Sequence, residues 1–457
     1  MSDEEHNILT SDLDESADRL EDIQLKKTIW ERYFSPMKEG SLRGSVFAIS
    51  AVAIGTGCFS LPIRCAHIGL IFGVCLLLFG AFCAYWSLTS MIHAARKSKE
   101  KDYSRIVKES LGKVPATILD SIMVIYIFGV LISYQVVIYS LIGRVFYELF
   151  QSNKYKDFEE YEKKIWNTNS YKFPVMFGVS FVLLPLCLLK DLSKMRFTSM
   201  IGIMALSYAI LVIIIESPFF FIHYLNNVYK KDDSSTHANF YNIKPAFKND
   251  LYVFQCFATV FYCFTCHIGA FPVYKTLKNN TVRRINKVFR NSIILDLVIY
   301  SLVAIAGFLT CPVNQPSLII YRENHGVLST DIFMTIAKMG IAISLTMSIP
   351  PNYNSFRISF IEVVFKTNEI SQKLNYGVTI PVVLLSTFIG VIYNDILKYI
   401  SLLGGFLSVV IAFLMPTMIY VKNNDYEITN WRNICSIIFV TFLCTVGFIA
   451  GIGTILF

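Results

Sequence analysis

Eleven blocks of apolar residues, roughly 20 to 35 residues long, occupy most of this 457-residue chain. A helix of about 20 apolar residues spans the hydrocarbon core of a bilayer. The blocks cannot share one soluble core, because such cores stop growing at about 250–300 residues. We therefore predict an all-α membrane protein with eleven transmembrane helices, at approximate positions 44–65, 69–93, 115–149, 172–190, 197–222, 251–273, 291–312, 329–351, 375–394, 396–421 and 432–456.

Lys and Arg are divided unevenly between the two sets of connecting segments. With the N-terminus in the cytoplasm, cytoplasmic segments hold 27 of the 41 cations and the opposite side holds 10, while four lie in or at the ends of spans. Cytoplasmic loops of membrane proteins carry such an excess. The formal charge of +8 therefore indicates orientation beside a lipid bilayer, and it does not indicate a nucleic-acid partner.

The N-terminal segment is acidic. Residues 1–22 contain nine Asp and Glu residues and one cation, Arg19, whereas a secretory signal begins with cations and an apolar run. We expect residues 1–43 to form a cytoplasmic, disordered tail and residues 44–457 to form a single transmembrane domain.

Enzyme and metal signatures are missing from the sequence. The eleven cysteines lie almost entirely within apolar blocks, where a thiol packs as a small apolar group. We find no metal-ligand cluster, no Walker loop and no nucleophile–base pair. The prediction is a protein that is not an enzyme and that needs no cofactor and no metal.

The first span contains residues that weaken a helix. Gly55 and Gly57 are separated by one residue, and Pro62 follows five residues later. Freed backbone groups at membrane depth must be satisfied, and transporters satisfy them with substrate or ions. The alternative is a kinked or closely packed helix.

The sixth span repeats this pattern. Gly269 and Pro272 follow a run of small residues around Cys266. The first and sixth spans are five apart, as a five-plus-five inverted repeat places its two discontinuous helices. The eleventh span would then lie outside the repeat.

These residues give the chain a family resemblance. The stretch Gly55-x-Gly57-x-x-x-Leu61-Pro62, continued to Gly69 and Gly73, resembles the first span of the amino acid/auxin permease family, in the amino acid–polyamine–organocation superfamily. The stretch from Cys266 to Leu277, followed by Thr281-Val-Arg283-Arg284, is similar to the sodium-coupled neutral amino acid branch. Gly404-Gly405 with Phe413, Pro416 and Tyr420 resembles its tenth span. The resemblance covers about residues 40–456 and implies an eleven-span, LeuT-like secondary carrier of amino acids.

The chain also departs from the sodium-coupled branch. The position of an asparagine that helps to hold sodium in that branch is matched by Ala51, and the eighth span ends in Pro350-Pro351 with a poor match. A sodium site needs hard oxygen ligands. This departure favours a proton-coupled or uncoupled carrier over a sodium-coupled one. The family usually has a small residue at the position that is occupied by Arg64 in this chain.

The candidate substrate-binding residues lie mainly on the two interrupted spans. Amides of the first interruption would bind an amino acid carboxylate, and the second would meet the side chain or, through its carbonyls, the ammonium group. For the second set the alternative is ordinary helix packing. The candidates are Gly55, Thr56, Gly57, Cys58, Phe264, Thr265 and Cys266, with Tyr134 on span 3 and the hydroxyls Ser344 and Thr346 on span 8.

Titratable groups within the spans are few. His267 lies inside the second interruption and is the proton-coupling candidate, since its unperturbed pKa is near neutrality; alternatively it fixes the local fold by bonding a freed carbonyl. Asp120, Glu216 and Asp296 are expected near span ends, and Lys338 deeper. No carboxylate is expected at the membrane centre.

The sequence thus predicts a secondary active or facilitative amino acid transporter that works by alternating access. Its small-molecule substrate would be an amino acid, with protons as a candidate coupling ion. Two alternatives stay open: a carrier of another organic solute such as a cationic amine, and an amino acid sensor without transport activity. The expected location is the plasma membrane or a vacuolar or endolysosomal membrane.

Overall fold

The computed structural model describes residues 40–189, 196–231, 251–278, 280–312, 315–324, 327–328, 331–367, 371–423 and 431–456. Within these residues all regular structure is helical. Ten helices are long and apolar enough to cross a membrane, or eleven if one bent pair counts as a single span. The predicted all-α protein with eleven spans is confirmed. The predicted acidic tail falls mostly on residues 1–39, outside the described part.

The spans follow one another along the chain. Spans 1 to 5 are α3 (Leu42–Ala53) with η1 (Thr56–Ser60) and α4 (Leu61–Ile68), α5 (Leu70–Ser98), α7 (Lys113–Phe146) with η2 (Tyr147–Gln151), α9 (Asn169–Leu188) and α10 (Arg196–Lys231). Spans 6 to 11 are α11 (Leu251–Cys263) with α12 (His267–Thr276), α13 (Val282–Thr310), α14 (Ile332–Phe365), α15 (Gln372–Ile392), the continuous run α16 (Ile396–Leu402), η7 (Leu403–Ser408), η8 (Val410–Leu414) and α17 (Met415–Asn423), and α18 (Trp431–Leu456).

Short helices lie between several spans. They are α6 (Tyr103–Leu111), α8 (Phe158–Tyr161), η3 (Glu162–Trp166) and η6 (Ile319–Tyr321).

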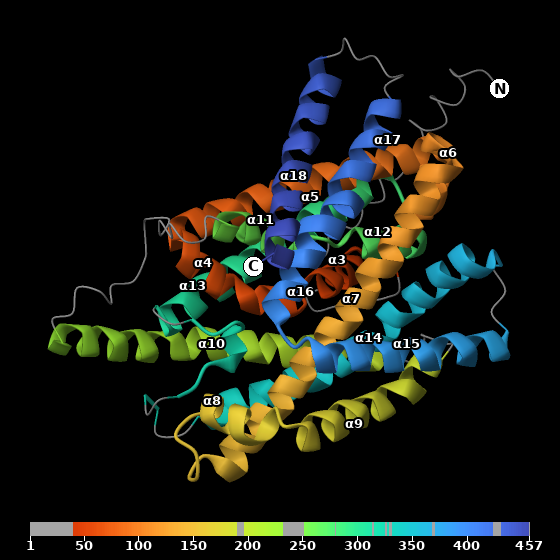
Figure 1. The fold of residues 1–457 in the computed structure, drawn as a ribbon. Helices are drawn as coiled ribbons and strands as arrows, with labels where there is room; N and C mark the ends of the chain where they lie inside the picture. Colours follow the sequence, from red (N-terminus) through yellow and green to blue (C-terminus); the bar gives the residue numbers. More distant parts are fainter. Residues whose placement is uncertain are drawn as a thin grey trace, which may run out of the picture.

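The spans pack as two interlocked groups. The helix α14 lies against α7 and α10, and α15 lies against α9 and α7. On the other side, α13 packs on α3, α4 and α5, while α11 packs on η7 and α18. In Figure 1 the helices α9, α10, α14 and α15 occupy the lower half, and α7 crosses diagonally between the groups. The interrupted spans 1 and 6 lie in the upper group.

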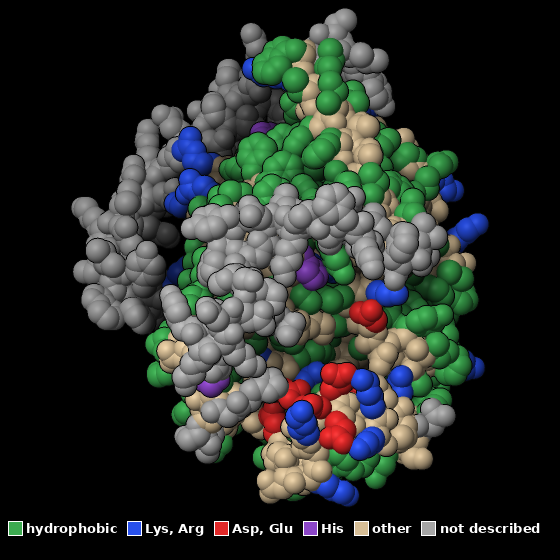
Figure 2. Space-filling view, turned by 60° about the vertical axis from the view of Figure 1, so that its left-hand side comes forward, with side chains coloured by type: hydrophobic (Ala, Val, Ile, Leu, Met, Phe, Trp, Pro, Cys, Tyr) green, Lys and Arg blue, Asp and Glu red, His purple; other side chains and the backbone are tan. Residues whose placement is uncertain are grey.

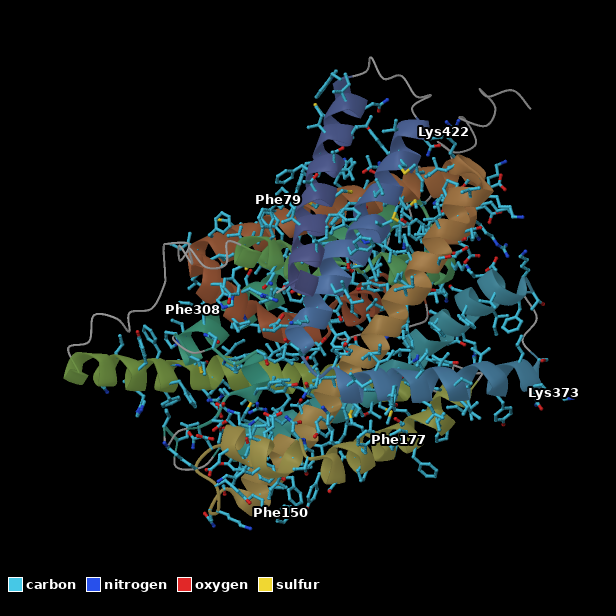
Figure 3. The ribbon with its side chains drawn as sticks, in the orientation of Figure 1. Phe79, Phe150, Phe177, Phe308, Lys373 and Lys422 are labelled. Atoms are coloured by element: carbon cyan, nitrogen blue, oxygen red, sulfur yellow. The ribbon has the colours of Figure 1, made fainter. Side chains whose placement is uncertain are left out.

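The surface has the character expected for contact with lipid. Large apolar side chains such as Phe82, Phe181 and Ile438 are exposed on spans 2, 4 and 11. Hydrophobic side chains cover much of the face in Figure 2, and acidic and basic side chains gather near its lower end. Figure 3 shows Phe150 and Phe177 at the periphery of the bundle, and both are exposed. An apolar outer surface is stable only in a nonpolar surrounding.

Several helices extend beyond the sequence-based limits, and the changes in spans 7 and 8 concern residues singled out from the sequence. Span 7 begins at Val282, nine residues before the expected start, so Asp296 is the fifteenth of its 29 residues. Asp296 thus lies at the middle of the helix, whose first turns carry Arg283, Arg284, Lys287 and Arg290. Span 8 does not end at Pro350-Pro351 but continues to Phe365. Packing of the following turns outweighs the local effect of the prolines, because Arg357 donates to Asn375 Oδ1 on α15 at 2.6 Å.

Candidate functional site

Span 1 is broken where its glycines lie. The helix α3 ends at Ala53, Ile54 and Gly55 are extended, and the two arms of the span are bent by 54°. Pro62 is at the start of α4, where its fixed φ suits the first helical turn. Two side chains satisfy carbonyls freed by the break: Cys58 Sγ donates to Gly55 O at 3.2 Å, and Ser60 Oγ donates to Gly57 O at 2.7 Å.

Span 6 is broken over Phe264–Cys266, between α11 and α12. Two hydroxyl groups again bind carbonyls near the break. Thr265 Oγ1 donates to Phe261 O at 2.6 Å, and Tyr300 Oη of α13 donates to Cys263 O at 2.8 Å. Both interrupted spans of the sequence-based prediction are therefore present.

The two breaks lie against each other. A Cβ atom added at Gly57 would be 2.7 Å from Tyr262 Cδ1 and 2.9 Å from Cys263 Sγ. A Cβ atom at Gly55 would be 3.0 Å from the Tyr134 hydroxyl of α7. The structure thus brings together both glycines, the end of α11 and Tyr134, in a closed arrangement with aromatic rings over the glycines.

Tyr262 connects the breaks to spans 3 and 10. Its hydroxyl lies beside Thr56 and Ser133, and its ring centre is 6.3 Å from that of Tyr126. Tyr126 in turn lies beside Ser408 of η7. The wide helical turns η7 and η8 occur here in span 10, and such turns are frequent at functional sites.

Several buried polar atoms around the breaks make no hydrogen bond of good geometry. Within the described residues these include Ser50 Oγ, Thr56 Oγ1, His267 Nδ1, Ser408 Oγ and both oxygens of Asp296. Thr56 and Ser408 lie beside the hydroxyls of Tyr262 and Tyr126, and Ser50 faces Asp296, so these side chains have polar neighbours in the closed arrangement. The atoms come from spans 1, 6, 7 and 10, which are the spans that surround the two breaks.

His267 faces away from span 1. Its Nε2 lies 3.0 Å from Ser87 Oγ of α5, and the Ser87 hydroxyl also donates to Ala412 O of η8. The ring is completely buried and lies edge-on to Phe413 at 6.4 Å. The side chain therefore joins α12 to spans 2 and 10.

The two candidate hydroxyls of span 8 have other contacts. Ser344 Oγ donates to Gly202 O of α10 at 3.0 Å, and Thr346 Oγ1 donates to Ala342 O of its own helix at 2.8 Å. These hydrogen bonds connect them to span 5 and to span 8 itself, not to the break of span 1.

Arg64 closes one end of the site. Its guanidinium is buried and donates to Thr259 Oγ1 at 3.0 Å, Gln255 Oε1 at 2.9 Å and Ser401 Oγ at 2.8 Å. These bonds join α4 to α11 and α16. The segment around Ile319 is also buried, and it lies near Gly307 together with Pro62 of α4.

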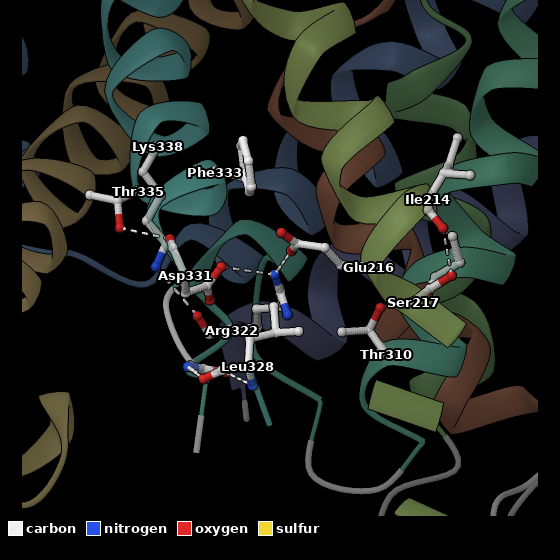
Figure 4. Close-up of polar contacts among 12 residues, drawn as sticks. Ile214, Glu216, Ser217, Thr310, Arg322, Leu328, Asp331, Phe333, Thr335 and Lys338 are labelled. Carbon is white, nitrogen blue, oxygen red and sulfur yellow. Dashed lines mark hydrogen bonds and ion pairs between the residues drawn. The ribbon is translucent and has the colours of Figure 1, made fainter. Parts of the chain in front are cut away.

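Charged side chains fix the segment between spans 7 and 8 at this end. Arg322 is ion-paired with Glu216 of α10 and lies 3.4 Å from Asp331. Lys338 of α14 is ion-paired with Glu148 of η2. Figure 4 shows Arg322 between Glu216 and Asp331, with Lys338 nearby. The expected intramembrane charges Glu216 and Lys338 thus have structural partners.

From the sequence, Asp296 is expected only as a charge near a span end, and it is not among the candidate site residues. It is fully buried at the middle of α13, and neither carboxylate oxygen has a hydrogen-bond partner within the described residues. Ser50 at the end of α3 is the polar side chain that faces it, although no hydrogen bond of good geometry joins the two. The sequence does contain a signal for a polar helix face, because Ser292, Asp296 and Tyr300 are spaced four residues apart.

Comparisons with known proteins identify the family that the chain resembles. The family model "Transmembrane amino acid transporter protein" matches residues 38–456. Sodium-coupled neutral amino acid symporter 2 of Danio rerio is 22% identical over 91% of this chain and 82% of its own length. Vacuolar amino acid transporter 5 of Schizosaccharomyces pombe is 24% identical over 82% of this chain and 83% of its own.

A solved structure has the same fold. The crystal structure of MhsT in complex with L-phenylalanine aligns with a TM-score of 0.52 and 12% identity, over 92% of this chain and 99% of the MhsT chain. The predicted LeuT-like architecture is confirmed by this likeness.

Proposed function

The chain belongs to the family of transmembrane amino acid transporter proteins, and we propose that it is a secondary carrier that moves amino acids by alternating access around the breaks of spans 1 and 6. The observation that carries this proposal is the contact between the two breaks at Gly57, Tyr262 and Cys263. Both breaks place free helix ends next to each other inside a bundle whose outer surface is apolar.

The electrostatics of the helix ends suit a zwitterion. The amides of Gly55, Thr56, Gly57 and Cys58 lie at the positive end of the outer arm of span 1, where an anion is stabilised by about 0.3–2 kcal/mol. The carbonyls of Phe264, Thr265 and Cys266 follow the negative end of α11 and suit an ammonium group. One amino acid would satisfy both sets.

Opening of the site requires movement of aromatic side chains. Tyr262 lies over Gly57 and Tyr134 lies over Gly55, so a substrate takes their place or enters beside them. Ser344 and Thr346 on span 8 are further proposed lining residues. They bond Gly202 O and Ala342 O in the closed arrangement, so they would meet a substrate only after span 8 moves relative to span 1.

We propose that the carrier is proton-coupled or uncoupled. Ala51 offers no oxygen ligand where the sodium-coupled branch has an asparagine. One matching relative is named as a vacuolar amino acid transporter, which supports the vacuolar membrane among the expected locations. The excess of Lys and Arg in one set of loops supports a cytoplasmic N-terminus.

Counterflow of labelled amino acids in proteoliposomes tests the proposal. Gly57→Val should abolish counterflow at normal expression, because the new side chain collides with Tyr262 and Cys263. Gly377→Val on α15 is the matched control, since nothing lies within 4 Å of its added Cβ. Equal counterflow by both variants would remove span 1 from the site. Flux of amines alone, or amino acid binding without flux, would favour the two alternative functions.

A further inference from the structure

We propose that the Asp296 carboxylate is a proton-binding site that couples amino acid transport to a proton gradient; this inference rests on the proposed transport function. Asp296 occupies the centre of α13 and is completely buried. A charged side chain inside a membrane span is costly and is retained for function more often than for stability.

The other charges within spans are accounted for by structural partners. Asp120 accepts a hydrogen bond from Ser104 Oγ at 2.7 Å. Glu216 and Lys338 belong to the ion pairs at the closed end of the site. Asp296 has no charged partner, since none of the described Lys, Arg and His side chains pairs with it. Ser50 Oγ faces it without a hydrogen bond of good geometry, so Asp296 has neither the ion pair of Glu216 and Lys338 nor the hydrogen bond of Asp120.

The direction in which Asp296 points follows from its neighbours on the same helix face. Ser292, one turn earlier, donates to Val46 O of α3 at 3.2 Å. Tyr300, one turn later, donates to Cys263 O of α11 at 2.8 Å. Residues at i, i+4 and i+8 lie on one face of a helix. Asp296 thus lies between a contact to the inner arm of span 1 and a contact to the break of span 6.

The groups around the carboxylate favour a proton over a metal cation. The titratable groups that face it are the thiols of Cys263 and Cys266 and the hydroxyl of Tyr300. The Tyr300 hydroxyl is already used by Cys263 O, which leaves Ser50 Oγ as the one additional hydroxyl facing Asp296 within the described residues. Hard cations such as Na⁺ need several oxygen ligands, whereas a proton needs only the carboxylate.

This environment links proton binding to closure of the site. In the closed arrangement the neutral acid fits the buried position, whereas the carboxylate anion would be left without a partner. Water reaches the anion only when the breaks separate. The carboxylate therefore takes up a proton from the more acidic compartment, the closed form becomes favourable, and the proton leaves on the other side with the amino acid.

His267 is the other titratable group at the breaks, and the geometry places it outside this route. Its Nε2 contacts Ser87, and its ring packs on Phe413 of span 10. Asp296, by contrast, faces the thiol of Cys266 inside the break and Ser50 on span 1. Asp296 is thus the titratable group that senses both interrupted spans.

The test measures accumulation in proteoliposomes driven by a pH gradient, with the membrane potential clamped at zero. One coupled proton per amino acid supports at most about tenfold accumulation per unit of pH difference, because one pH unit is a tenfold proton ratio. Wild type should approach this limit, and Asp296→Asn, which imitates the protonated acid, should retain counterflow but fail to accumulate. Asp296→Glu should keep part of the accumulation. Asp120→Asn is the matched control and should behave as wild type.

Results that overturn the proton site can be told apart from results that refute amino acid transport. Undiminished accumulation by Asp296→Asn, or accumulation driven only by sodium, would overturn the inference. Wild-type counterflow without any accumulation driven by the pH gradient would also overturn it and leave amino acid transport intact, whereas absence of any wild-type counterflow would refute transport itself.

A second measurement covers the case in which Asp296→Asn does not fold. Purified wild-type protein in weak buffer with a pH indicator should take up protons when it binds an amino acid, because ligands that favour the same state bind together. Amino acid binding with no proton exchange at any pH in the acidic to neutral range would contradict the inference.

Discussion

Replacement of Arg64 by Ala should open one end of the site. The Arg64 guanidinium joins α4 to α11 and α16 through Thr259, Gln255 and Ser401, at distances of 2.8–3.0 Å. These are the helices that must separate if the site is to open at this end. Alanine removes all three bonds, and the remaining hydroxyl and amide groups can bind water once the end is open.

The expected size of the effect on the open population follows from the charge of the Arg64 guanidinium donor. A hydrogen bond to a charged group contributes about 1.5–3 kcal/mol. If opening breaks only one of the three bonds, Arg64→Ala raises the open population by about 10- to 150-fold. Arg64→Lys keeps the charge but lacks the planar fork of donors, so its effect should be intermediate.

Reaction with a membrane-impermeant thiol reagent measures the open population. Cys65 and Cys256 are buried beside Arg64, and the thiol of Cys256 lies 3.6 Å from the Arg64 carbonyl oxygen. The reagent is added to sealed proteoliposomes, and mass spectrometry identifies the modified cysteines. We expect faster modification of both in Arg64→Ala.

The matched control is Arg105→Ala on α6, where the arginine is largely exposed. It should leave the modification rates unchanged. Equal rates in wild type and Arg64→Ala would refute the assignment of Arg64 as the closing contact. Faster modification in Arg105→Ala as well would point to general loosening of the bundle and would refute the reasoning equally.

Two further predictions concern packing and charge. Gly404→Ala should lower the unfolding temperature markedly, because the added Cβ would lie 1.9 Å from the Ala258 carbonyl oxygen, a backbone atom that can move little. Overpacking of this kind costs about 1–3 kcal/mol of stability. Gly377→Ala, with open space around the added Cβ, is the control that should unfold as wild type does. Arg322→Met should destabilise the protein by about 3–5 kcal/mol in denaturant unfolding, because Glu216 loses its buried partner, and adding Glu216→Gln should restore part of the loss; no restoration would contradict the pairing.

The fold was largely predictable from residue types, because its main determinants are local. Long apolar blocks mark the spans, and Gly55, Gly57 and Pro62 mark the break in span 1. Gly404 in span 10 marks the place where η7 approaches α11, and Gly405 the place where it approaches α18, yet the wide turns themselves depend on packing and have no sequence signature. The contact between the breaks likewise depends on tertiary structure.

The depth of Asp296 could not be predicted because the first turns of α13 are polar. Arg283, Arg284, Lys287 and Arg290 delay the apolar block to about residue 291, although Thr281 caps the helix by accepting a hydrogen bond from Arg284 N. Hydropathy therefore gives the start of the apolar block, whereas the helix itself begins nine residues earlier and places Asp296 at its middle. The hydrogen bond from Ser344 to the Gly202 carbonyl of α10 could not be predicted from the hydropathy pattern either, since it depends on which helix lies beside span 8.

The central claim is that the two breaks together form an amino acid site. An experimental structure of the protein in complex with an amino acid that it transports tests this most directly. The account predicts the carboxylate of the ligand at the amides of Gly55–Cys58 and its ammonium at the carbonyls of Phe264–Cys266, with Tyr134 and Tyr262 displaced or packed on the ligand. An amino acid bound elsewhere in the bundle, with Tyr262 still in place over Gly57, would contradict it.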